Sequence, residues 1–220
     1  MTTVDPDAVE YIPAEAASTY TKLAAAYGQE YYEAVADELV RSLDTGESVV
    51  DAGTGPGFLP LELAERTDSL RIDGFDFTRT LLEFGHRRVK ERGLLNRVSF
   101  YVADCYTIPV PDQSYTALTC TGVLHALEEP VAALTEFHRV LEPTGKAWVF
   151  DPAILQVPDD PDVELTPHEQ SVLDAYEGKT RTKGITVAEA ERFARESPFE
   201  RTRIVEGEMG DVRLYLGTHS

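Results

Sequence analysis

The 220-residue sequence predicts an α/β protein with a seven-stranded, mostly parallel sheet, a C-terminal antiparallel hairpin and helices on both faces. Two observations support this prediction. Short apolar runs alternate with helical patterns between residues 48 and 150, which indicates repeated strand–helix–strand units and hence a parallel sheet. Two alternating runs separated by glycines close the sequence, which is typical of a hairpin. The length suits a single domain over residues 1–220.

The N-terminal region is expected to be helical after a loose start. Residues 1–16 are acidic, contain proline and show no periodicity. From Ser18 onward, tyrosine and aliphatic side chains recur at helical spacing, which predicts one or two helices that end near Thr45 and Gly46. We interpret residues 1–46 as a helical lid over the carboxyl edge of the sheet.

Five apolar runs have the length and composition of buried parallel strands. They are Ser48–Ala52, Leu70–Phe75, Val98–Val102, Ala117–Thr121 and Ala147–Phe150. Helical patterns separate them at Phe58–Arg66, Thr80–Arg92 and Val131–Leu141. The last of these is preceded by Glu128-Glu129-Pro130, two acids and a proline that suit the first turn of a helix.

The pattern changes after Asp151-Pro152, where a polar, proline-containing stretch begins. We interpret residues 151–185 as an insertion within the domain. Two helices are expected at Thr166–Tyr176 and Thr186–Glu196, and the predicted hairpin pairs Arg201–Glu206 with Val212–Gly217 through Gly207 and Gly210.

The charge balance bears on possible partners. The chain has 39 acidic and 20 basic residues, giving a formal net charge of −19, and such a surface repels phosphate backbones and anionic lipids. We therefore expect neither nucleic acid nor a membrane as a partner. Because the bases comprise 15 arginines and only 5 lysines, the composition also suggests an acidic protein of a halophilic host.

Several classes of protein are disfavoured by what the sequence lacks. No run of 18 apolar residues occurs, and the acidic start lacks the bases of a targeting peptide, so we expect a cytoplasmic protein. Cys105 and Cys120 lack metal or redox spacing, the five histidines are scattered, and no metal is expected. Neither a G-x-S-x-G elbow nor a G-x-x-x-x-G-K-[ST] loop is present, which argues against hydrolases and nucleoside triphosphatases.

The most informative segment is a glycine-rich turn after the first predicted strand, Val49-Val50-Asp51-Ala52-Gly53-Thr54-Gly55-Pro56-Gly57-Phe58. In a parallel sheet this turn lies at the carboxyl edge, where free backbone NH groups and a helix N-terminus can bind a ligand. Glycine allows the main chain to approach the ligand closely. A tight strand-to-helix turn without any ligand is the alternative interpretation of the glycines alone.

Two carboxylates at the next strand ends favour a nucleoside ligand. Asp76 follows the second predicted strand, 19 residues after Gly57, near the position at which such folds place an acid on the ribose hydroxyls. Asp104 follows the third strand, where its side chain or the adjacent NH can meet an adenine edge. Either acid alone could instead cap a helix or a loop.

The glycine spacing distinguishes among nucleoside ligands. NAD sites prefer G-x-G-x-x-G, whereas Gly53, Gly55 and Gly57 alternate here and Phe58 follows. The alternating form after Asp51 resembles the first motif of class I S-adenosylmethionine-dependent methyltransferases, whose Rossmann-like sheet also ends in an antiparallel hairpin. The runs Ile108-Pro109-Val110-Pro111-Asp112, Val123-Leu124-His125 and Phe137-His138-Arg139-Val140-Leu141-Glu142-Pro143-Thr144-Gly145-Lys146 resemble the small-molecule group (methyltransferase type 11) that includes the ubiquinone and menaquinone C-methylating enzymes.

This resemblance implies an S-adenosylmethionine site. The implied contacts are Asp51, Ala52, Gly53, Thr54 and Gly55 at the methionine end, Asp76 and Phe77 at ribose and adenine, Asp104 and Cys105 at adenine, and Thr121 beside the sulfonium. Tyr27 matches a lid aromatic that reaches the methionine moiety in this group, although packing among the neighbouring tyrosines would explain it equally well.

Methyl transfer from a sulfonium requires mainly alignment of the reactants and exclusion of water. An acceptor hydroxyl, amine or acidic carbon must also lose a proton to a base. His125 follows the fourth predicted strand and is the only histidine expected near the methyl donor, so we assign it as the candidate catalytic residue. Helix capping or packing is the alternative role.

The acceptor is not assigned by the sequence. Tyr115-Thr116, Ala126 and Thr144 depart from the residues usual in the quinone-methylating group, which weakens any transfer of its substrate. The leading hypothesis is an enzyme that methylates a small molecule, with residues 151–185 and the N-terminal helices selecting that acceptor. A catalytically silent cofactor-binding subunit and an NAD-linked oxidoreductase remain as alternatives.

Overall fold

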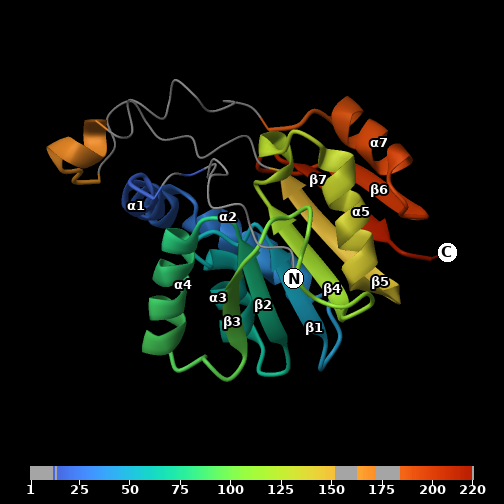
Figure 1. Cartoon of the computed structure of the whole chain (residues 1–220), viewed down its shortest axis with the longest axis horizontal. Helices are drawn as coiled ribbons and strands as arrows, with labels where there is room; N and C mark the ends of the chain where they lie inside the picture. The colour runs from blue at the N-terminus through green and yellow to red at the C-terminus, as the bar shows by residue number, and fades with distance from the viewer. Residues whose placement is uncertain (1–11, 13, 152–162, 172–183, 220) are drawn as a thin grey trace.

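A computed structural model of the chain describes residues 12, 14–151, 163–171 and 184–219. Its centre is a seven-stranded sheet with the strand order β3-β2-β1-β4-β5-β7-β6 (Figure 1). The strands are β1 (Ser48–Ala52), β2 (Arg71–Asp76), β3 (Val98–Val102), β4 (Tyr115–Thr121), β5 (Leu141–Asp151), β6 (Arg201–Glu206) and β7 (Val212–Gly217). The helices are α1 (Ala17–Tyr27), α2 (Gln29–Val40), α3 (Phe58–Arg66), α4 (Arg79–Glu91), the short 3-10 turn η1 (Leu124–Ala126), α5 (Pro130–Val140) and α7 (Val187–Glu196).

The predicted fold class is confirmed. Strands β1 to β5 run parallel, and β7 lies antiparallel between β5 and β6. The predicted bounds of β1, β3, α3 and both hairpin strands agree with the structure. Those of β2, α4 and α5 are shifted by one residue at both ends, α7 begins one residue later than predicted, and β4 begins two residues earlier. Helix α5 begins at Pro130 with Glu129 as its N-cap, so the two glutamates precede the first turn instead of lying in it.

Strand β5 begins earlier than predicted, at Leu141 instead of Ala147. The exposed Pro143 breaks the apolar pattern and suggests a turn, which is why the sequence prediction starts the strand too late. In the structure Leu141 pairs with Tyr115 of β4, and an irregularity in the β4–β5 register after this pair accommodates the polar residues.

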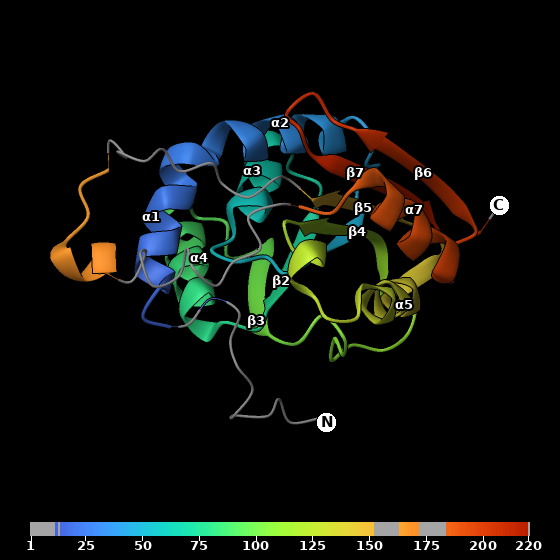
Figure 2. The same cartoon turned by 90° about the horizontal axis from the view of Figure 1, so that it is seen from above.

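Helices cover both faces of the sheet, as Figure 2 shows. One core lies between the sheet and α2, α3 and α4, and it includes Leu39, Leu61 and Val89. The other lies between the sheet and α5 and α7, and it includes Phe137 and Phe193. None of the helices in the described ranges is long and apolar enough to cross a lipid bilayer.

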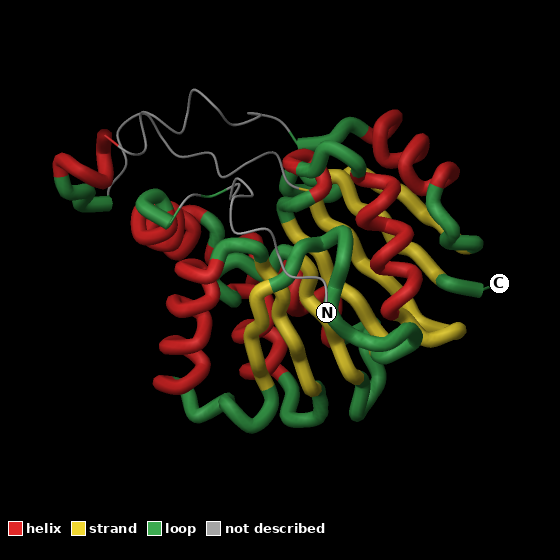
Figure 3. The backbone as a smooth tube through the Cα atoms, in the orientation of Figure 1, coloured by secondary structure: helices red, strands yellow, loops and turns green. Residues whose placement is uncertain are grey.

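The N-terminal region forms two helices, which Gly28 divides. Helix α1 lies at the end of the molecule where the parallel strands end (Figure 3). Near the start of this region, Thr78 Oγ1 donates a hydrogen bond to the carbonyl oxygen of Ile12 at 3.1 Å, just after β2. The N-terminal helices therefore sit beside the carboxyl edge of the sheet.

Part of the predicted insertion contacts this helical region. Lys22 of α1 forms an ion pair with Glu169 at 2.7 Å, and the pKa of Glu169 is lowered to about 2, mainly by the hydrogen bond from Lys22. The described part of the predicted helix Thr166–Tyr176 is helical over residues 167–171, and residues 172–176 lie outside the described ranges. The division of the single domain into a lid and an insertion stays a prediction.

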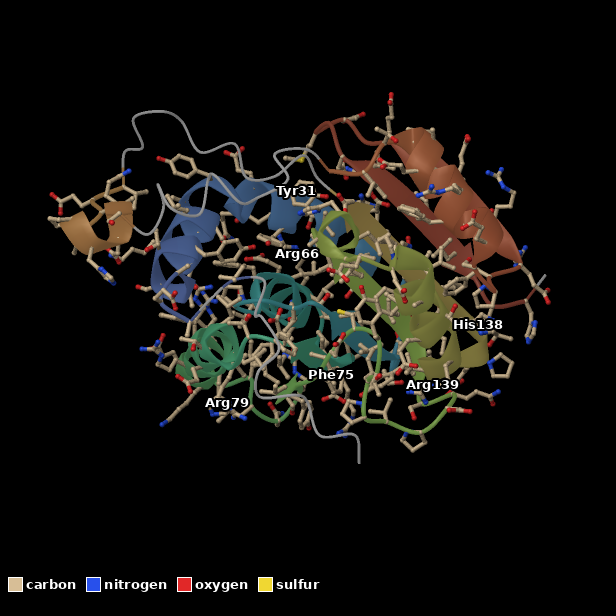
Figure 4. The ribbon with its side chains drawn as sticks, turned by 45° about the horizontal axis from the view of Figure 1, so that its top comes forward. Tyr31, Arg66, Phe75, Arg79, His138 and Arg139 are labelled. Carbon is tan, nitrogen blue, oxygen red and sulfur yellow. The ribbon has the colours of Figure 1, made fainter. Side chains whose placement is uncertain are left out.

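A polar network joins α2 to β7, and Tyr31, one of its members, is labelled in Figure 4. Arg213 Nε donates to Asp211 Oδ2 at 2.6 Å and its Nη1 donates to Glu38 Oε2 at 2.6 Å. The Tyr31 hydroxyl donates to Asp211 at 3.0 Å, and the Tyr215 hydroxyl donates to Glu38 at 2.6 Å. Because Asp211 is fully buried, its charge depends on these donors.

Candidate active site

The loops that follow β1, β2 and β3 are hydrogen-bonded to one another at the carboxyl edge of the sheet. The backbone nitrogens of Gly53 and Thr54 donate to the carbonyl oxygen of Phe75 at 2.8 and 3.0 Å. The backbone nitrogen of Ala103 donates to the carbonyl oxygen of Asp76 at 3.0 Å. The side chains at three separate strand ends are therefore held in a common framework.

The three glycines of the turn after β1 all have positive φ angles, 73° at Gly53, 54° at Gly55 and 75° at Gly57. A Cβ atom at Gly53 would lie 2.3 Å from Val123 Cγ2, and one at Gly57 would lie 2.4 Å from Phe100 Cζ. Among the described residues, a Cβ atom at Gly55 would meet nothing within 4 Å. Packing thus requires glycine at two of the positions, whereas Gly55 faces open space.

Asp76, the last residue of β2, points back to this turn. Its Oδ2 atom accepts a hydrogen bond from the backbone nitrogen of Gly55 at 2.7 Å, and its Oδ1 atom accepts one from the backbone nitrogen of Thr78 at 2.8 Å. These two contacts hold the carboxylate between the glycine turn and the loop after β2. Phe77 follows directly and is half-buried.

Asp51 is a buried acid near the end of β1, with only 2% of its surface exposed. Burial raises its pKa to about 6, and the Thr119 hydroxyl, which donates to Asp51 Oδ1 at 2.7 Å, opposes that rise. The nearby carboxylate of Asp76 raises the pKa further. A cation next to Asp51 would lower its pKa again, because an opposite charge favours the ionised carboxylate.

Asp104 and Cys105 follow β3. Asp104 Oδ1 accepts a hydrogen bond from the backbone nitrogen of Tyr106 at 2.9 Å, which fixes the loop. The pKa of the Cys105 thiol is raised by burial, then by the carboxylates of Asp76, Asp104 and Asp51. Asp76 pairs with Val102, two residues before Asp104, and its carboxylate accepts from Gly55 of the turn after Asp51, so the three acids lie at neighbouring strand ends of one sheet edge.

Several buried hydroxyl groups have no hydrogen-bond partner in the described part of the chain. Among them are the Tyr27 hydroxyl at the end of α1 and the Thr121 hydroxyl at the end of β4. A buried hydroxyl without a partner is costly, so a polar ligand or water is expected to satisfy each of them.

His125 lies in η1, beyond the end of β4, and is 7% exposed. Its Nδ1 atom lies 3.1 and 3.2 Å from the two carboxylate oxygens of Asp151, the last residue of β5. Its backbone nitrogen donates to Asp151 Oδ2 at 3.0 Å. Val123, which packs on Gly53, connects this histidine turn to the glycine turn.

The structure brings most of the predicted site residues to one edge of the sheet: the glycine turn, Asp51, Asp76, Phe77, Asp104, Cys105 and Thr121, with His125 beyond the neighbouring strand end. The side chain of Ala52 packs in the core, so it can meet a ligand only through its backbone. Sequence analysis missed Asp151. The signal was present, because Asp151 follows an apolar run in the same way as Asp76 and Asp104, but Pro152 made it look like the start of the insertion.

The arrangement defines a class of fold. A sheet with parallel β1 to β5 and an antiparallel β7, with a glycine turn after β1 and an acid after β2, is a Rossmann-like nucleoside-binding fold. Ligands of such sheets bind outside the carboxyl ends of the strands, which is the edge where the predicted site residues lie.

Comparison with known proteins specifies the class further. Residues 49–145 match the family described as methyltransferase domain. The chain is 36% identical over 104 residues to the ubiquinone/menaquinone biosynthesis C-methyltransferase UbiE of Geobacter sp. (strain M21), which covers 47% of this chain and 44% of the relative. It is 34% identical over 103 residues to the demethylmenaquinone methyltransferase of Thermus thermophilus, covering 47% and 46%. The chain thus spans less than half the length of the curated relatives it matches.

Solved structures share the whole fold. An S-adenosylmethionine-dependent methyltransferase from Aquifex aeolicus superposes with a TM-score of 0.63 at 20% identity, over 83% of this chain and 89% of that one. A candidate S-adenosylmethionine-dependent methyltransferase from Methanococcus maripaludis superposes with a TM-score of 0.76 at 16% identity, over 99% and 98%. Residues 49–145 thus match a methyltransferase domain, the chain has the fold of these methyltransferase structures, and the resemblance inferred from the sequence is confirmed.

Proposed function

We propose that the protein transfers a methyl group from S-adenosylmethionine to a small-molecule acceptor. The observation that carries this proposal is the convergence of Asp51, Asp76 and Asp104 around the glycine turn of a methyltransferase domain. The open space at Gly55 and the unpartnered hydroxyl of Thr121 supply room and polar contacts at the same edge. These features fit a ligand with an ammonium group, a carboxylate, ribose hydroxyls and an adenine ring.

Different residues would bind different parts of the ligand. The buried carboxylate of Asp51 would hold the ammonium group, and the backbone from Gly53 to Gly55 would hold the methionine carboxylate. Asp76 and Phe77 would hold the ribose and one side of the adenine ring, and Asp104 with Cys105 would hold the adenine edge. Tyr27 and Thr121 would complete the site near the sulfonium, because their hydroxyls are buried without a partner.

The bound cofactor supplies a methyl group that is already activated by its sulfonium. The protein contributes alignment of the acceptor and exclusion of water, which α1 supports from beside the strand ends. His125 would take a proton from the acceptor, since it is the histidine on the loop that packs against the glycine turn.

The acceptor stays open within the small-molecule class. The two relatives named above act in quinone biosynthesis by their names, but their similarity covers less than half of either chain. The family match ends at residue 145 and begins at residue 49, so it leaves out the N-terminal helices and residues 151–185. We assign acceptor selection to these two unmatched regions, because they lie outside the conserved cofactor half of the fold.

Calorimetry followed by turnover tests this proposal. We expect S-adenosylmethionine and S-adenosylhomocysteine to bind and NAD not to bind. Asp76→Asn should weaken S-adenosylhomocysteine binding at least tenfold, since a charge-assisted hydrogen bond is worth about 1.5–3 kcal/mol. Glu83→Gln, on the exposed face of α4, is the matched control and should leave binding unchanged. Preferential binding of NAD would favour an oxidoreductase, and tight S-adenosylmethionine binding without turnover would favour a silent regulatory subunit.

We also propose, from composition, that the protein works in the cytoplasm of a salt-rich cell, without a nucleic-acid or membrane partner. The excess of 39 acidic over 20 basic residues would keep the surface hydrated at high ionic strength, and salt would screen its self-repulsion. Thermal unfolding in low and in molar KCl tests this, and we expect a higher melting temperature in molar KCl. An unchanged melting temperature and solubility would contradict the halophilic assignment.

A further inference from the structure

The strongest feature beyond the cofactor residues is the carboxylate of Asp151. This group is 1% exposed, and three donors surround it. The backbone nitrogens of His125 and Ile185 donate to it at 3.0 and 3.1 Å, and His125 Nδ1 lies within 3.1 Å. The positions of both backbone donors are fixed by the fold. Their hydrogen bonds therefore hold the Asp151 carboxylate in a fixed position next to the imidazole.

This geometry determines which nitrogen of the neutral imidazole carries the proton. A carboxylate that already accepts from two backbone NH groups offers only acceptor oxygens to His125, so Nδ1 must donate. Nε2 is then the unprotonated nitrogen. Across the described residues Nε2 makes no hydrogen bond. His125 follows Leu124 in the same turn as Val123, and Val123 packs on Gly53 of the glycine turn. An imidazole with this tautomer and an unengaged Nε2 is suited to accept a proton.

We propose that Asp151 is the positioning residue that makes His125 a general base, and that the methyl acceptor is therefore a group that must lose a proton, namely a hydroxyl group, a primary or secondary amine or an acidic carbon. This inference rests on the proposed methyltransferase function and deepens it. A tertiary amine, which has no proton to give, would not require the pair. The backbone donors to Asp151 explain its burial, but they do not explain the orientation of His125 Nδ1 toward both carboxylate oxygens.

The proposed step balances. As the acceptor atom forms its bond to the methyl carbon, its bond to hydrogen breaks and the proton moves to His125 Nε2. The electron pair of the broken carbon–sulfur bond stays on sulfur, which becomes the neutral thioether of S-adenosylhomocysteine. The positive charge ends on the imidazolium, where the buried carboxylate of Asp151 stabilises it. Solvent later removes this proton.

The first test needs no acceptor. In the histidine ¹⁵N spectrum of the intact protein, the signals missing from His125→Gln identify His125. We expect Nδ1 protonated and Nε2 unprotonated at a pH where the ring is neutral. Asp151→Asn should reverse the tautomer, because its one side-chain oxygen can still accept from one of the two backbone NH groups while its NH₂ group donates to Nδ1. Asp73→Asn is the matched control, since Asp73 Oδ2 accepts a hydrogen bond from the Tyr115 hydroxyl of β4 and not from His125, and it should leave His125 unchanged.

The second test is kinetic, with an acceptor found by screening hydroxyl, primary or secondary amine and carbon-acid compounds. Asp151→Asn should lower kcat at least 100-fold, with the KM of the acceptor and the Kd of S-adenosylhomocysteine within twofold. Wild-type protein with Nε2 protonated, or an Asp151→Asn variant that reverses the tautomer and keeps its kcat, overturns the inference. If Asp151→Asn fails to fold, the wild-type tautomer and the kcat loss of His125→Gln decide instead. The expected tautomer with no methyl transfer to any acceptor would refute the proposed function, not the geometry.

Discussion

Alanine substitution in the glycine turn should separate packing from ligand binding. At Gly53 a new Cβ atom would lie 2.3 Å from a methyl group of Val123, whereas at Gly55 it would meet nothing within 4 Å among the described residues. Both positions have positive φ, which costs alanine about 1 kcal/mol. Forcing a methyl group into packed surroundings adds about 1–3 kcal/mol at Gly53. We therefore expect Gly53→Ala to lose about 2–4 kcal/mol of unfolding free energy, and Gly55→Ala about 1 kcal/mol.

The assay is urea or thermal unfolding of both variants, followed by calorimetry with S-adenosylhomocysteine. In a chain of this size about 1 kcal/mol shifts the melting temperature by about 2–4 °C, so the two variants are well resolved. Gly55→Ala should also weaken binding at least tenfold, because its methyl group would enter the space assigned to the ligand. The control is Gly46→Ala, which has a φ of 88° and open surroundings but precedes β1, away from the site.

Equal stability losses at Gly53 and Gly55 would refute the packing argument, because the strain from positive φ is common to both. Unchanged S-adenosylhomocysteine binding by Gly55→Ala would refute the assignment of the open space to the ligand. A loss of binding by Gly46→Ala equal to that of Gly55→Ala would show that backbone strain alone acts on affinity.

Three further predictions concern other charged groups. Burial raises the pKa of Asp51 from 3.8 to about 6, so the native state holds this proton more tightly than the unfolded state. The contribution of Asp51 to the unfolding free energy is therefore full below pH 4 and falls by about 3 kcal/mol as the pH rises through 6. Asp51→Asn should abolish this fall, which urea titrations from pH 4 to 8 would measure. Arg213→Met should cost about 3 kcal/mol in urea unfolding, because it strips a buried carboxylate of its cation. Lys22→Glu and Glu169→Lys should each raise the acceptor KM without changing the Kd of S-adenosylhomocysteine, and the double variant should restore it.

Each of these predictions has a control. Thr119→Val removes the hydroxyl that opposes the pKa shift of Asp51, so it should enlarge the fall in stability instead of abolishing it. Arg203→Met removes an exposed arginine that lies over the Tyr215 ring, and it should cost less than about 1 kcal/mol. A loss as large as that of Arg213→Met would contradict the role given to the buried ion pair. Failure of the double variant to restore the acceptor KM would contradict a role of the Lys22–Glu169 ion pair in acceptor binding.

Local patterns are sufficient to predict most of this fold. The apolar runs of β1 and β3 are bounded by turn residues, and their ends in the sequence match their ends in the structure. The strand-end rule of parallel sheets then brings Asp51, Asp76 and Asp104 to one edge without any knowledge of distances. This part of the site depends on topology, and topology follows from the alternation of strands and helices.

The rest depends on contacts between distant parts of the chain. The ion pair between Arg213 and Glu38 joins residues 175 positions apart, and nothing near either residue signals the other. The contact between Gly53 and Val123 is of the same kind. At β5, Leu141 pairs with Tyr115 of β4 and the pairing resumes only at Lys146, so residues 142–145 around Pro143 bulge between two paired stretches.

The face of the sheet on which each acid lies suggests a division of roles among the strand-end aspartates. Asp51 shares its side of β1 with Val49, which packs in the core beneath α2, α3 and α4. Asp151 shares its side of β5 with Val149, which packs beneath α5 and α7. The sheet thus separates the acid assigned to the cofactor from the acid that holds His125. Substitutions at Asp51 should therefore act on ligand affinity and those at Asp151 on the rate of proton transfer.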